Sequence, residues 1–316
     1  MLCQLAHHFP PFVESFLERS RPLRRRFREE SVTDLLMGSL ITAGGRRIIV
    51  EFPDEPVTGA DMEWNFVNPD DGTFFRMLLQ AKQCYGGGSV WTRHGYKELL
   101  HQSGSGRKLQ ASVLCDTARA ATATYPLYIF YNPASTCEAA RGAGFTAVTG
   151  ANLADGYLIE GLVRGATTRA LRTGNKSLKA IAPLLFPLTD LFCPQAVLAT
   201  GPQAFAPGAP AFPLAVGIAG GRSVLGVPVP PTPAAIRQRL VAARDALAKT
   251  GIKETAAAPG VPAIAERIPD DVSAAIERAQ ARARSQPGLR RWRVTFVSAN
   301  PVDRYSGPGL IRRRPQ

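Results

Sequence analysis

A short turn between two alternating segments constrains the fold of this chain more than any other feature of its sequence. Residues 68–72 combine Asn, Pro, Asp and Gly, which favour a tight reversal of the backbone. The flanking segments, 59–66 and 73–82, both alternate between apolar and polar residues with the period of a strand. The sequence therefore predicts two neighbouring antiparallel strands joined by a hairpin.

The segments on either side of this hairpin predict an alternating α/β unit. Residues 30–42 carry an apolar helical face, and residues 46–52 are rich in β-branched side chains typical of a strand. Helical periodicity returns between residues 91 and 123, and residues 125–131 form an aromatic-rich buried strand. The predicted order is helix, three antiparallel strands, helix and strand, which indicates an α/β fold with a mixed central sheet.

Composition divides the chain into four predicted parts. These parts are a helical extension over 1–27, an α/β domain over 28–199, a linker rich in Pro, Gly and Ala over 200–232, and a mainly helical C-terminal region over 233–316. Further helices are predicted over 153–164, 177–186, 232–249 and 270–285, and a late strand over 292–298. The sequence leaves open whether the C-terminal region is a separate domain or packs back onto the α/β domain.

A strongly basic charge indicates an anionic partner. The formal net charge is +13, and arginines cluster at 24–26, 46–47, 290–291 and 312–314. Because a Lys or Arg set against a phosphate releases condensed counterions, nucleic acid is the first predicted partner and an acidic membrane surface the second. A solvated surface is the alternative interpretation of each cluster.

The cysteines and histidines argue against several classes of protein. The five cysteines are widely separated, with no C-x-x-C pair and no Cys/His spacing suited to zinc. The four histidines form no H-x-x-x-H or H-E-x-x-H arrangement, so a histidine metal site or a Ser/His hydrolase is poorly supported. The first 28 residues contain no apolar run suited to a signal peptide or membrane span. These features predict a cytoplasmic protein without a membrane segment.

Polar residues on the two hairpin strands suggest a site. Because side chains alternate along a strand, Asp61 shares a face with Glu63, and Gln80 shares a face with Lys82. A closed hairpin brings Asp61 towards Gln80 and Lys82. Carboxylate and amide oxygens are hard ligands for Mg²⁺ or Mn²⁺, and an ammonium group can hold or activate water near a scissile phosphate. The pattern favours phosphodiester hydrolysis.

The same residues resemble a known nuclease signature. Asp61, followed by Gln80-Ala81-Lys82, looks like the D…(E/Q)-x-K signature of the PD-(D/E)XK nuclease superfamily, in the Mrr-like branch where Gln replaces the acidic residue. The predicted element order matches the α-β-β-β-α-β core of that restriction-endonuclease-like superfamily. The surrounding residues are also similar to an uncharacterised bacterial family assigned to it.

The resemblance implies a role for each matching residue. Asp61 is the central metal ligand, and Lys82 orients the attacking water and stabilises the charge of the phosphorane. Gln80 contributes its amide oxygen, and the carbonyl of Ala81 is a further ligand. Glu30, on the preceding helix, corresponds to the acidic residue that many members place beside the metal.

The resemblance covers about residues 28–132 and implies a restriction-like endonuclease of bacterial defence. Its substrate is double-stranded DNA, its cofactor is Mg²⁺ or Mn²⁺, and paired protomers in a homodimer can cut both strands. Gln110, in the following helix, is a weaker candidate for the site.

The glutamine in the motif leaves alternatives open. An amide oxygen binds Mg²⁺ less well than a carboxylate, unless Glu30, Glu51 or Glu63 compensates. A catalytically inactive DNA-binding or assembly module is therefore the second hypothesis. An RNase or repair-type nuclease on the same core is the third.

Overall fold

A mixed seven-stranded sheet forms the centre of the computed structural model, which describes residues 2–23, 27–44, 47–53, 61–103, 108–193, 229–249, 259–281, 289 and 291–298. The strand order is β1-β9-β2-β3-β6-β7-β8. The strands are β1 (Ile48–Glu51), β2 (Met62–Asn68), β3 (Thr73–Gln83), β6 (Thr124–Tyr131), β7 (Ala151–Asp155), β8 (Phe186–Pro187) and β9 (Trp292–Val297), with a separate pair β4 (Gln102–Ser103) and β5 (Lys108–Leu109). The predicted α/β class with a mixed sheet is confirmed.

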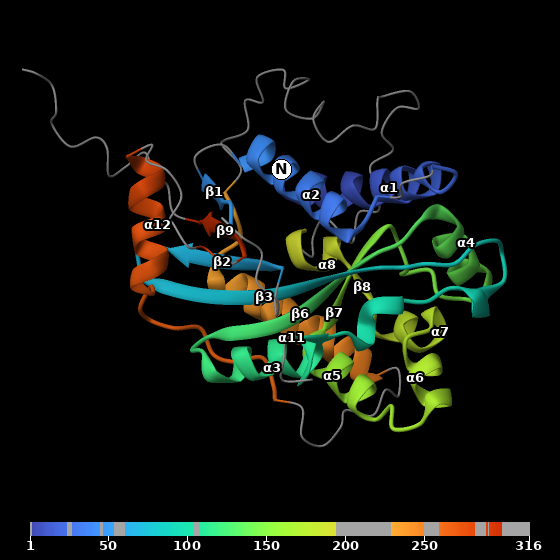
Figure 1. The fold of residues 1–316 in the computed structure, drawn as a ribbon. Coiled ribbons are helices and arrows are strands. Elements are labelled where there is room, and N and C mark those ends of the chain that lie inside the picture. The colour runs from blue at the N-terminus through green and yellow to red at the C-terminus, as the bar shows by residue number, and fades with distance from the viewer. Residues whose placement is uncertain are drawn as a thin grey trace, which may run out of the picture.

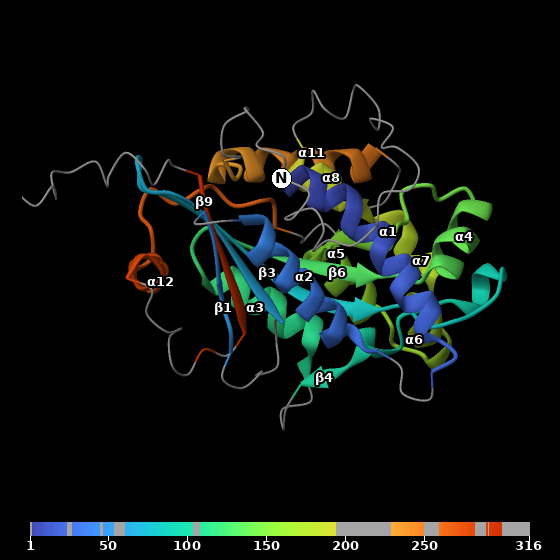
Figure 2. The same ribbon diagram turned by 90° about the horizontal axis from the view of Figure 1, so that it is seen from above.

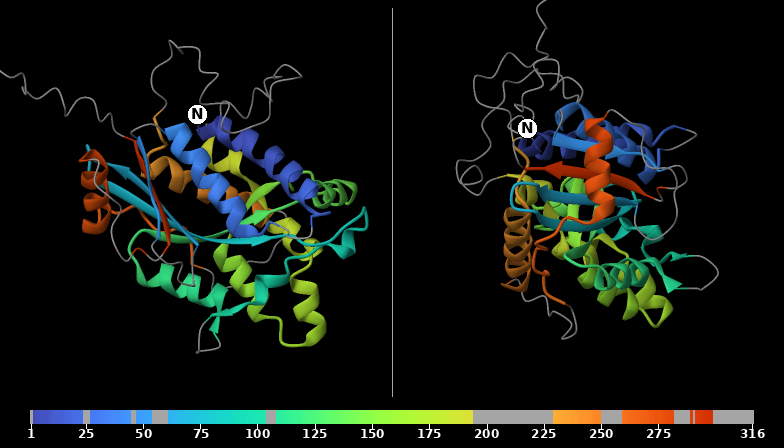
Figure 3. Two further views of the ribbon diagram at one scale, coloured as in Figure 1. Left: turned by 45° about the horizontal axis from the view of Figure 1, so that its top comes forward. Right: turned by 90° about the vertical axis from the view of Figure 1, so that its left-hand side faces the viewer.

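Helices cover both faces of this sheet (Figure 1). Helices α1, α2 and α8 lie on one face and α3 and α5 on the other, while α12 stands at the end formed by β1 and β9 (Figure 3). Helix α11 packs beside α8 (Figure 2). The helices are α1 (Leu2–Ser20), α2 (Glu29–Gly44), α3 (Gln110–Ala120), α4 (Ala134–Gly142), α5 (Gly156–Arg164), α6 (Arg169–Asn175), α7 (Leu178–Ile181), α8 (Leu188–Phe192), α11 (Pro233–Lys249) and α12 (Asp270–Gln280). Among the described residues, no helix has the length and apolar character to cross a bilayer.

The predicted hairpin is confirmed. Strands β2 and β3 are antiparallel, with pairs running from Met62 opposite Leu79 to Asn68 opposite Thr73. Asp71 accepts hydrogen bonds from the backbone N–H and the hydroxyl of Thr73, and Gly72 has a φ of 73°, the left-handed conformation that favours glycine. The turn therefore fixes the register of both strands, and with it the side chains that share a face.

The first of the three predicted strands does not lie beside the second. Strand β9 is inserted between them, antiparallel to β1 and parallel to β2. The three predicted strands therefore alternate in direction as predicted, but only the second and third are neighbours. Aromatic packing explains the insertion: the Phe296 ring stacks on Phe66 at 4.6 Å and meets Trp64 edge-on at 6.0 Å. The predicted late strand is confirmed, and this part of the C-terminal region packs within the central sheet.

The predicted helices are confirmed unevenly. Helices α2, α11 and α12 match predictions, as does strand β6. The stretch 91–123 contains two short 3-10 helices and the β4–β5 pair before α3, and α7 covers only part of 177–186. The stretch 153–164 was predicted as a helix, but its first residues belong to strand β7. The sequence did not distinguish the two, because a fully buried strand and a buried helix have the same apolar pattern. Of the predicted linker over 200–232, only 229–232 lies within the described residues.

Helix α1 packs closely against the loop before β7. Its side chains Phe9 and Val13 are fully buried, and the Glu14 carboxylate accepts a hydrogen bond from the Gly150 N–H at 2.9 Å. A Cβ atom on Gly150 would clash with the Pro10 carbonyl oxygen and with Glu14. The glycine is thus required by a close approach of two backbone segments.

We expect Gly150→Ala to lower the free energy of unfolding by about 1–3 kcal/mol, because the helix must move away from the loop. Urea denaturation measures the change. The control is Gly142→Ala, where the added methyl group meets nothing within 4 Å. Equal stability of the two variants would contradict the close packing of α1.

Candidate functional site

Asp61 lies directly before β2 and contacts the motif on β3. The Gln80 side chain donates from Nε2 to Asp61 Oδ2 at 2.6 Å, and the Ala81 backbone N–H donates to the same oxygen at 2.7 Å. Lys82 follows two positions after Gln80, so both side chains lie on one face of β3. The structure therefore brings together Asp61, Gln80 and Ala81, with Lys82 on the same face.

Lys82 is buried and contacts the start of helix α2. Its Nζ atom lies 3.4 Å from Glu29 Oε1, and the side chains are only 3% and 16% exposed. Glu30, the acid predicted to lie beside the metal, occupies the next helical position and is exposed. It is thus Glu29 that contacts Lys82.

Helical periodicity carries a signal that could have identified Glu29. Thr33 is buried and its hydroxyl lies 3.2 Å from that of Tyr131 on β6. Residues four positions apart lie on one helical face, so Glu29 shares the inward face with Thr33. The acidic pair at the start of α2 predicts a carboxylate near the site, and the period of the helix selects which of the two it is.

Burial and neighbouring charges perturb both carboxyl groups of the site. Burial raises the pKa of Glu29 to about 7, with Lys82 opposing the shift and Asp61 adding to it. Burial also raises the pKa of Asp61, although Lys82 and the Ala81 N–H act to lower it and Glu30 acts to raise it. Two buried carboxyl groups thus share the charge of Lys82, and an additional cation would stabilise their ionised forms.

Three buried oxygens near these groups have no hydrogen-bond partner among the described residues. They are Gln80 Oε1, Gln110 Oε1 and the Tyr128 hydroxyl. Tyr128 pairs with Gln80 across β3 and β6, so the two side chains share a face. Gln110 is the first residue of α3, which packs against the same two strands. An unsatisfied buried acceptor is unfavourable by about 1–3 kcal/mol, so a ligand that bonds to these oxygens would remove this cost.

The donor set fits a hard divalent cation. Rotation of the Gln80 amide would exchange Nε2 for Oε1 at the Asp61 carboxylate and present two oxygens to one ion. Mg²⁺ binds proteins through one or two such oxygens and keeps several waters. Within the described residues, Asp61, Glu29 and Glu30 do not converge as a group of three ligands. The protein therefore offers a sparse site in which water supplies much of the coordination.

The neighbouring carboxylates, Glu63 and Glu51, are held by arginines. Glu63 Oε1 lies 3.0 Å from Arg293 Nε and 3.5 Å from Arg76, and Glu51 lies 2.8 Å from Arg278. Burial acts to raise the pKa of Glu63, but Arg76 and Arg293 hold it below its usual value. These two residues therefore form a buried ionic network and do not add charge to the site of Asp61.

Arg291, from one of the predicted basic clusters, lies close to the site in the chain's fold. Arg291 immediately precedes Trp292, whose backbone N–H donates to the Asp61 carbonyl at 3.2 Å. Arg47, from another cluster, is buried and does not form a solvated patch. The clusters at 24–26 and 312–314 lie outside the described residues.

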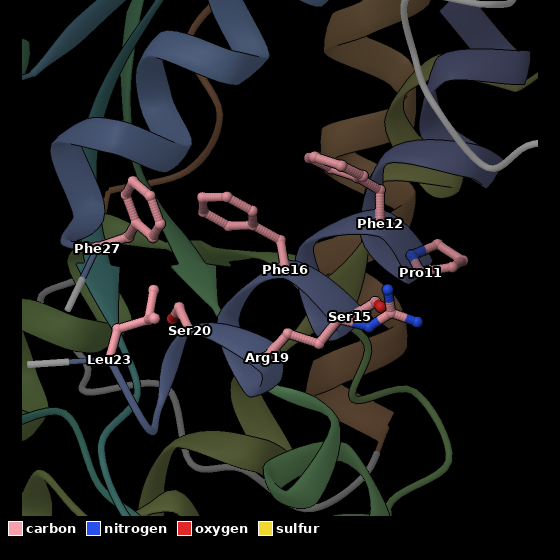
Figure 4. Close-up of a pocket in the computed structure, with 8 residues that line it drawn as sticks. All are labelled: Pro11, Phe12, Ser15, Phe16, Arg19, Ser20, Leu23 and Phe27. Atoms are coloured by element: carbon pink, nitrogen blue, oxygen red, sulfur yellow. The ribbon is translucent and has the colours of Figure 1, made fainter.

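A groove along α1 is a hollow of the surface away from the Asp61 motif (Figure 4). Its volume is about 520 Å³, and its lining is mainly aromatic and apolar. The lining residues are Pro11, Phe12, Ser15, Phe16, Arg19, Ser20, Leu23 and Phe27. None of these carries a carboxylate, thiol or imidazole, so the groove offers no site for acid/base or metal chemistry.

The raised pKa of Glu29 predicts a pH dependence of stability. The folded state binds this proton up to pH of about 7, whereas an unfolded glutamate releases it near its ordinary value of 4.5. The Glu29 proton therefore contributes to the stability of the folded state in full below pH 4.5, and this contribution is lost as the pH rises through 7. We expect the stability of the wild type relative to Glu29→Gln to fall by about 1–3 kcal/mol between pH 5 and pH 8.

Urea denaturation of both proteins at the two pH values gives this difference. Glu138→Gln, at an exposed position on α4, serves as the matched control and should keep the pH dependence of the wild type. If Glu29→Gln also keeps that dependence, Glu29 is not the group responsible.

Comparison with known proteins gives one match. The model of a family of unknown function, DUF6615, matches residues 2–303. No curated protein and no solved structure matches the chain.

Proposed function

The chain belongs to the DUF6615 family of unknown function, and we propose that it is a metal-dependent endonuclease of the PD-(D/E)XK type that hydrolyses phosphodiester bonds of double-stranded DNA. The observation that carries this proposal is the contact of Asp61 with Gln80 and Ala81, beside buried Lys82. A carboxylate, an amide and an ammonium group are the side chains that such hydrolysis uses.

Each residue has a defined part in the proposed reaction. Asp61 and Gln80 would hold Mg²⁺ or Mn²⁺, which as a Lewis acid polarises the scissile phosphate and lowers the pKa of a bound water. Lys82 orients the attacking water and stabilises the negative charge that develops on the phosphate. Glu29 keeps the Lys82 ammonium in place, because the two groups lie 3.4 Å apart in a buried setting.

The arrangement of elements supports the restriction-endonuclease-like core. Helix α2 precedes strands β1, β2 and β3, and helix α3 precedes β6, which is parallel to β3. Helices α2 and α3 cover opposite faces of the sheet (Figure 1). In the proposed core, strand β9 would be an addition, since it lies between β1 and β2.

Duplex DNA is the substrate class that the charge favours. The chain carries a formal net charge of +13, and Arg291 lies next to the residue that contacts the Asp61 backbone. Arginine and lysine side chains that contact phosphates bind DNA without regard to sequence. In the proposed reaction they would hold the duplex while one strand is cut. A homodimer would cut both strands, as in restriction of foreign DNA.

Incubation of the purified chain with supercoiled plasmid tests the function. With Mg²⁺ or Mn²⁺ we expect nicked and linear products, and with a chelator none. Single-stranded DNA and RNA offered as competitors identify the preferred substrate. Cleavage that persists without divalent cations would reject the proposal.

A catalytically inactive module is the second candidate function. It is favoured by one observation: Gln80 replaces a carboxylate, while arginines engage the nearby Glu51 and Glu63. A module of this kind binds DNA with an affinity that falls steeply with salt and cuts nothing under any divalent cation. The plasmid experiment, repeated as a binding measurement across salt concentrations, separates the two functions.

A further inference from the structure

A group of three metal-binding side chains lies far from the Asp61 motif in the sequence. Cys3 and Cys193, separated by 190 positions, form a disulfide that joins the first turn of α1 to the residue after α8. His7 lies one helical turn after Cys3, and the ligand atoms of the three residues lie within 4.8 Å of one another. The spacing of the sequence did not reveal this group, because one of its members comes from a distant element.

We propose that the reduced chain binds Zn²⁺ through Cys3, His7 and Cys193, with water as the fourth ligand. Thiolate and imidazole are the ligands that select zinc over Mg²⁺ or Ca²⁺. Zinc takes four ligands in a tetrahedron, and a site with three protein ligands keeps one position open. Cys193 is buried while Cys3 and His7 reach solvent, so the open position faces water.

Cys3 lies at the start of α1, one helical turn before His7. It is the second residue of the 19-residue helix α1, where backbone N–H groups and the helix dipole stabilise negative charge. The remaining cysteines, Cys84, Cys115 and Cys137, are buried, and burial raises the pKa of each thiol, that of Cys84 to about 12. Within the described residues, none of these three cysteines belongs to a group of three possible metal ligands, so Cys3 and Cys193 are the favoured pair.

Disulfide and zinc are alternative states of the same two sulfur atoms. Zinc binding to the reduced site displaces one proton from each thiol. A hydroperoxide can reverse this state: the two thiolates give up two electrons, the S–S bond forms, and the O–O bond breaks to yield water and an alcohol after taking up two protons. The ion then leaves, because a disulfide sulfur is not a thiolate ligand.

The test uses the full chain, reduced with a phosphine and then freed of it. Zn²⁺ is titrated against a chromophoric chelator, and Co²⁺ is added separately to record the absorption of tetrahedral thiolate coordination. We expect one zinc per chain, at least about tenfold weaker binding in His7→Ala, and loss of the site in Cys3→Ser. The matched controls are His8→Ala, next along α1, and Cys137→Ser, a cysteine outside the group.

The outcomes decide the proposal without any measurement of nuclease activity. Release of zinc on addition of hydrogen peroxide, with recovery after reduction, supports it. If the reduced wild type binds no zinc, or if His7→Ala and Cys3→Ser bind as tightly as their controls, the site is a disulfide with a neighbouring histidine and the proposal is overturned. Circular dichroism of each reduced variant distinguishes a lost site from a lost fold.

Discussion

Replacing Lys82 with Met is expected to slow plasmid cleavage by at least about 10²–10³-fold, because in the proposed reaction its ammonium group stabilises the charge that develops on the phosphate. Methionine is unbranched and apolar, so it fills the buried space that the lysine side chain occupies. The carboxyl group of Glu29 loses its partner, but its pKa of about 7 lets it take up a proton near neutral pH. We therefore expect the variant to remain folded.

Two comparisons make this result specific. Lys179→Met, at an exposed position on α7, removes one positive charge from the surface and should leave the cleavage rate nearly unchanged. Asp61→Asn should abolish cleavage together with Mn²⁺ binding, whereas Lys82→Met keeps that binding. Cleavage by Lys82→Met at the rate of the wild type would remove the basis of the nuclease proposal, although the zinc site at Cys3 would be untouched.

The largest loss of stability is expected from Arg293→Met. The guanidinium group of Arg293 lies 3.0 Å from Glu63 and 2.8 Å from Asp271, and its side chain is 9% exposed. Its removal leaves buried Glu63 without its nearest arginine, with Arg76 and the Asn65 amide among the remaining partners. Breaking a buried ion pair in this way lowers stability by about 3–5 kcal/mol. Urea denaturation followed by circular dichroism measures the change.

Arg267→Met provides the matched control. Arg267 pairs with Asp270 at 3.0 Å, but both side chains are more than 80% exposed, so the expected loss is below about 1 kcal/mol. A double variant tests whether the loss comes from the Glu63 carboxylate that Arg293→Met leaves without its partner. Glu63→Leu combined with Arg293→Met removes this carboxylate and should recover part of the stability. Equal losses in Arg293→Met and Arg267→Met would show that the buried network does not hold β9 in place.

The length of each connection explains which parts of the fold could be predicted. Only four residues join β2 to β3, so these strands must be neighbours, and the prediction from the turn was confirmed. The connection from β1 to β2 spans about ten residues, enough to pass over an intervening strand, given a spacing of about 4.8 Å between strands. Nothing in the first half of the sequence specifies that β9 fills this gap.

The candidate site also has one part that could be predicted from local sequence and another that depends on packing between distant elements. The contact between Asp61 and Gln80 depends on the hairpin, and local alternation placed both residues correctly on one face. The exposed position of Glu30 and the contact of Glu29 with Lys82 depend instead on which side of α2 faces the sheet. Successive residues of a helix differ by about 100° in direction, so an error of one residue selects the wrong glutamate. The unsatisfied hydroxyl of Tyr128 could not be anticipated, because an aromatic residue in a buried strand is typical of a core.

The late position of β9 in the chain has a consequence for how the protein is made. Strand β1, the outer edge of β2 and the Asp61 carbonyl lack the hydrogen bonds that β9 supplies until residue 297 has left the ribosome. Until then a nascent chain carries two open sheet edges and an incompletely supported Asp61. Premature termination before β9 is therefore expected to yield a fragment with open sheet edges that is prone to aggregate.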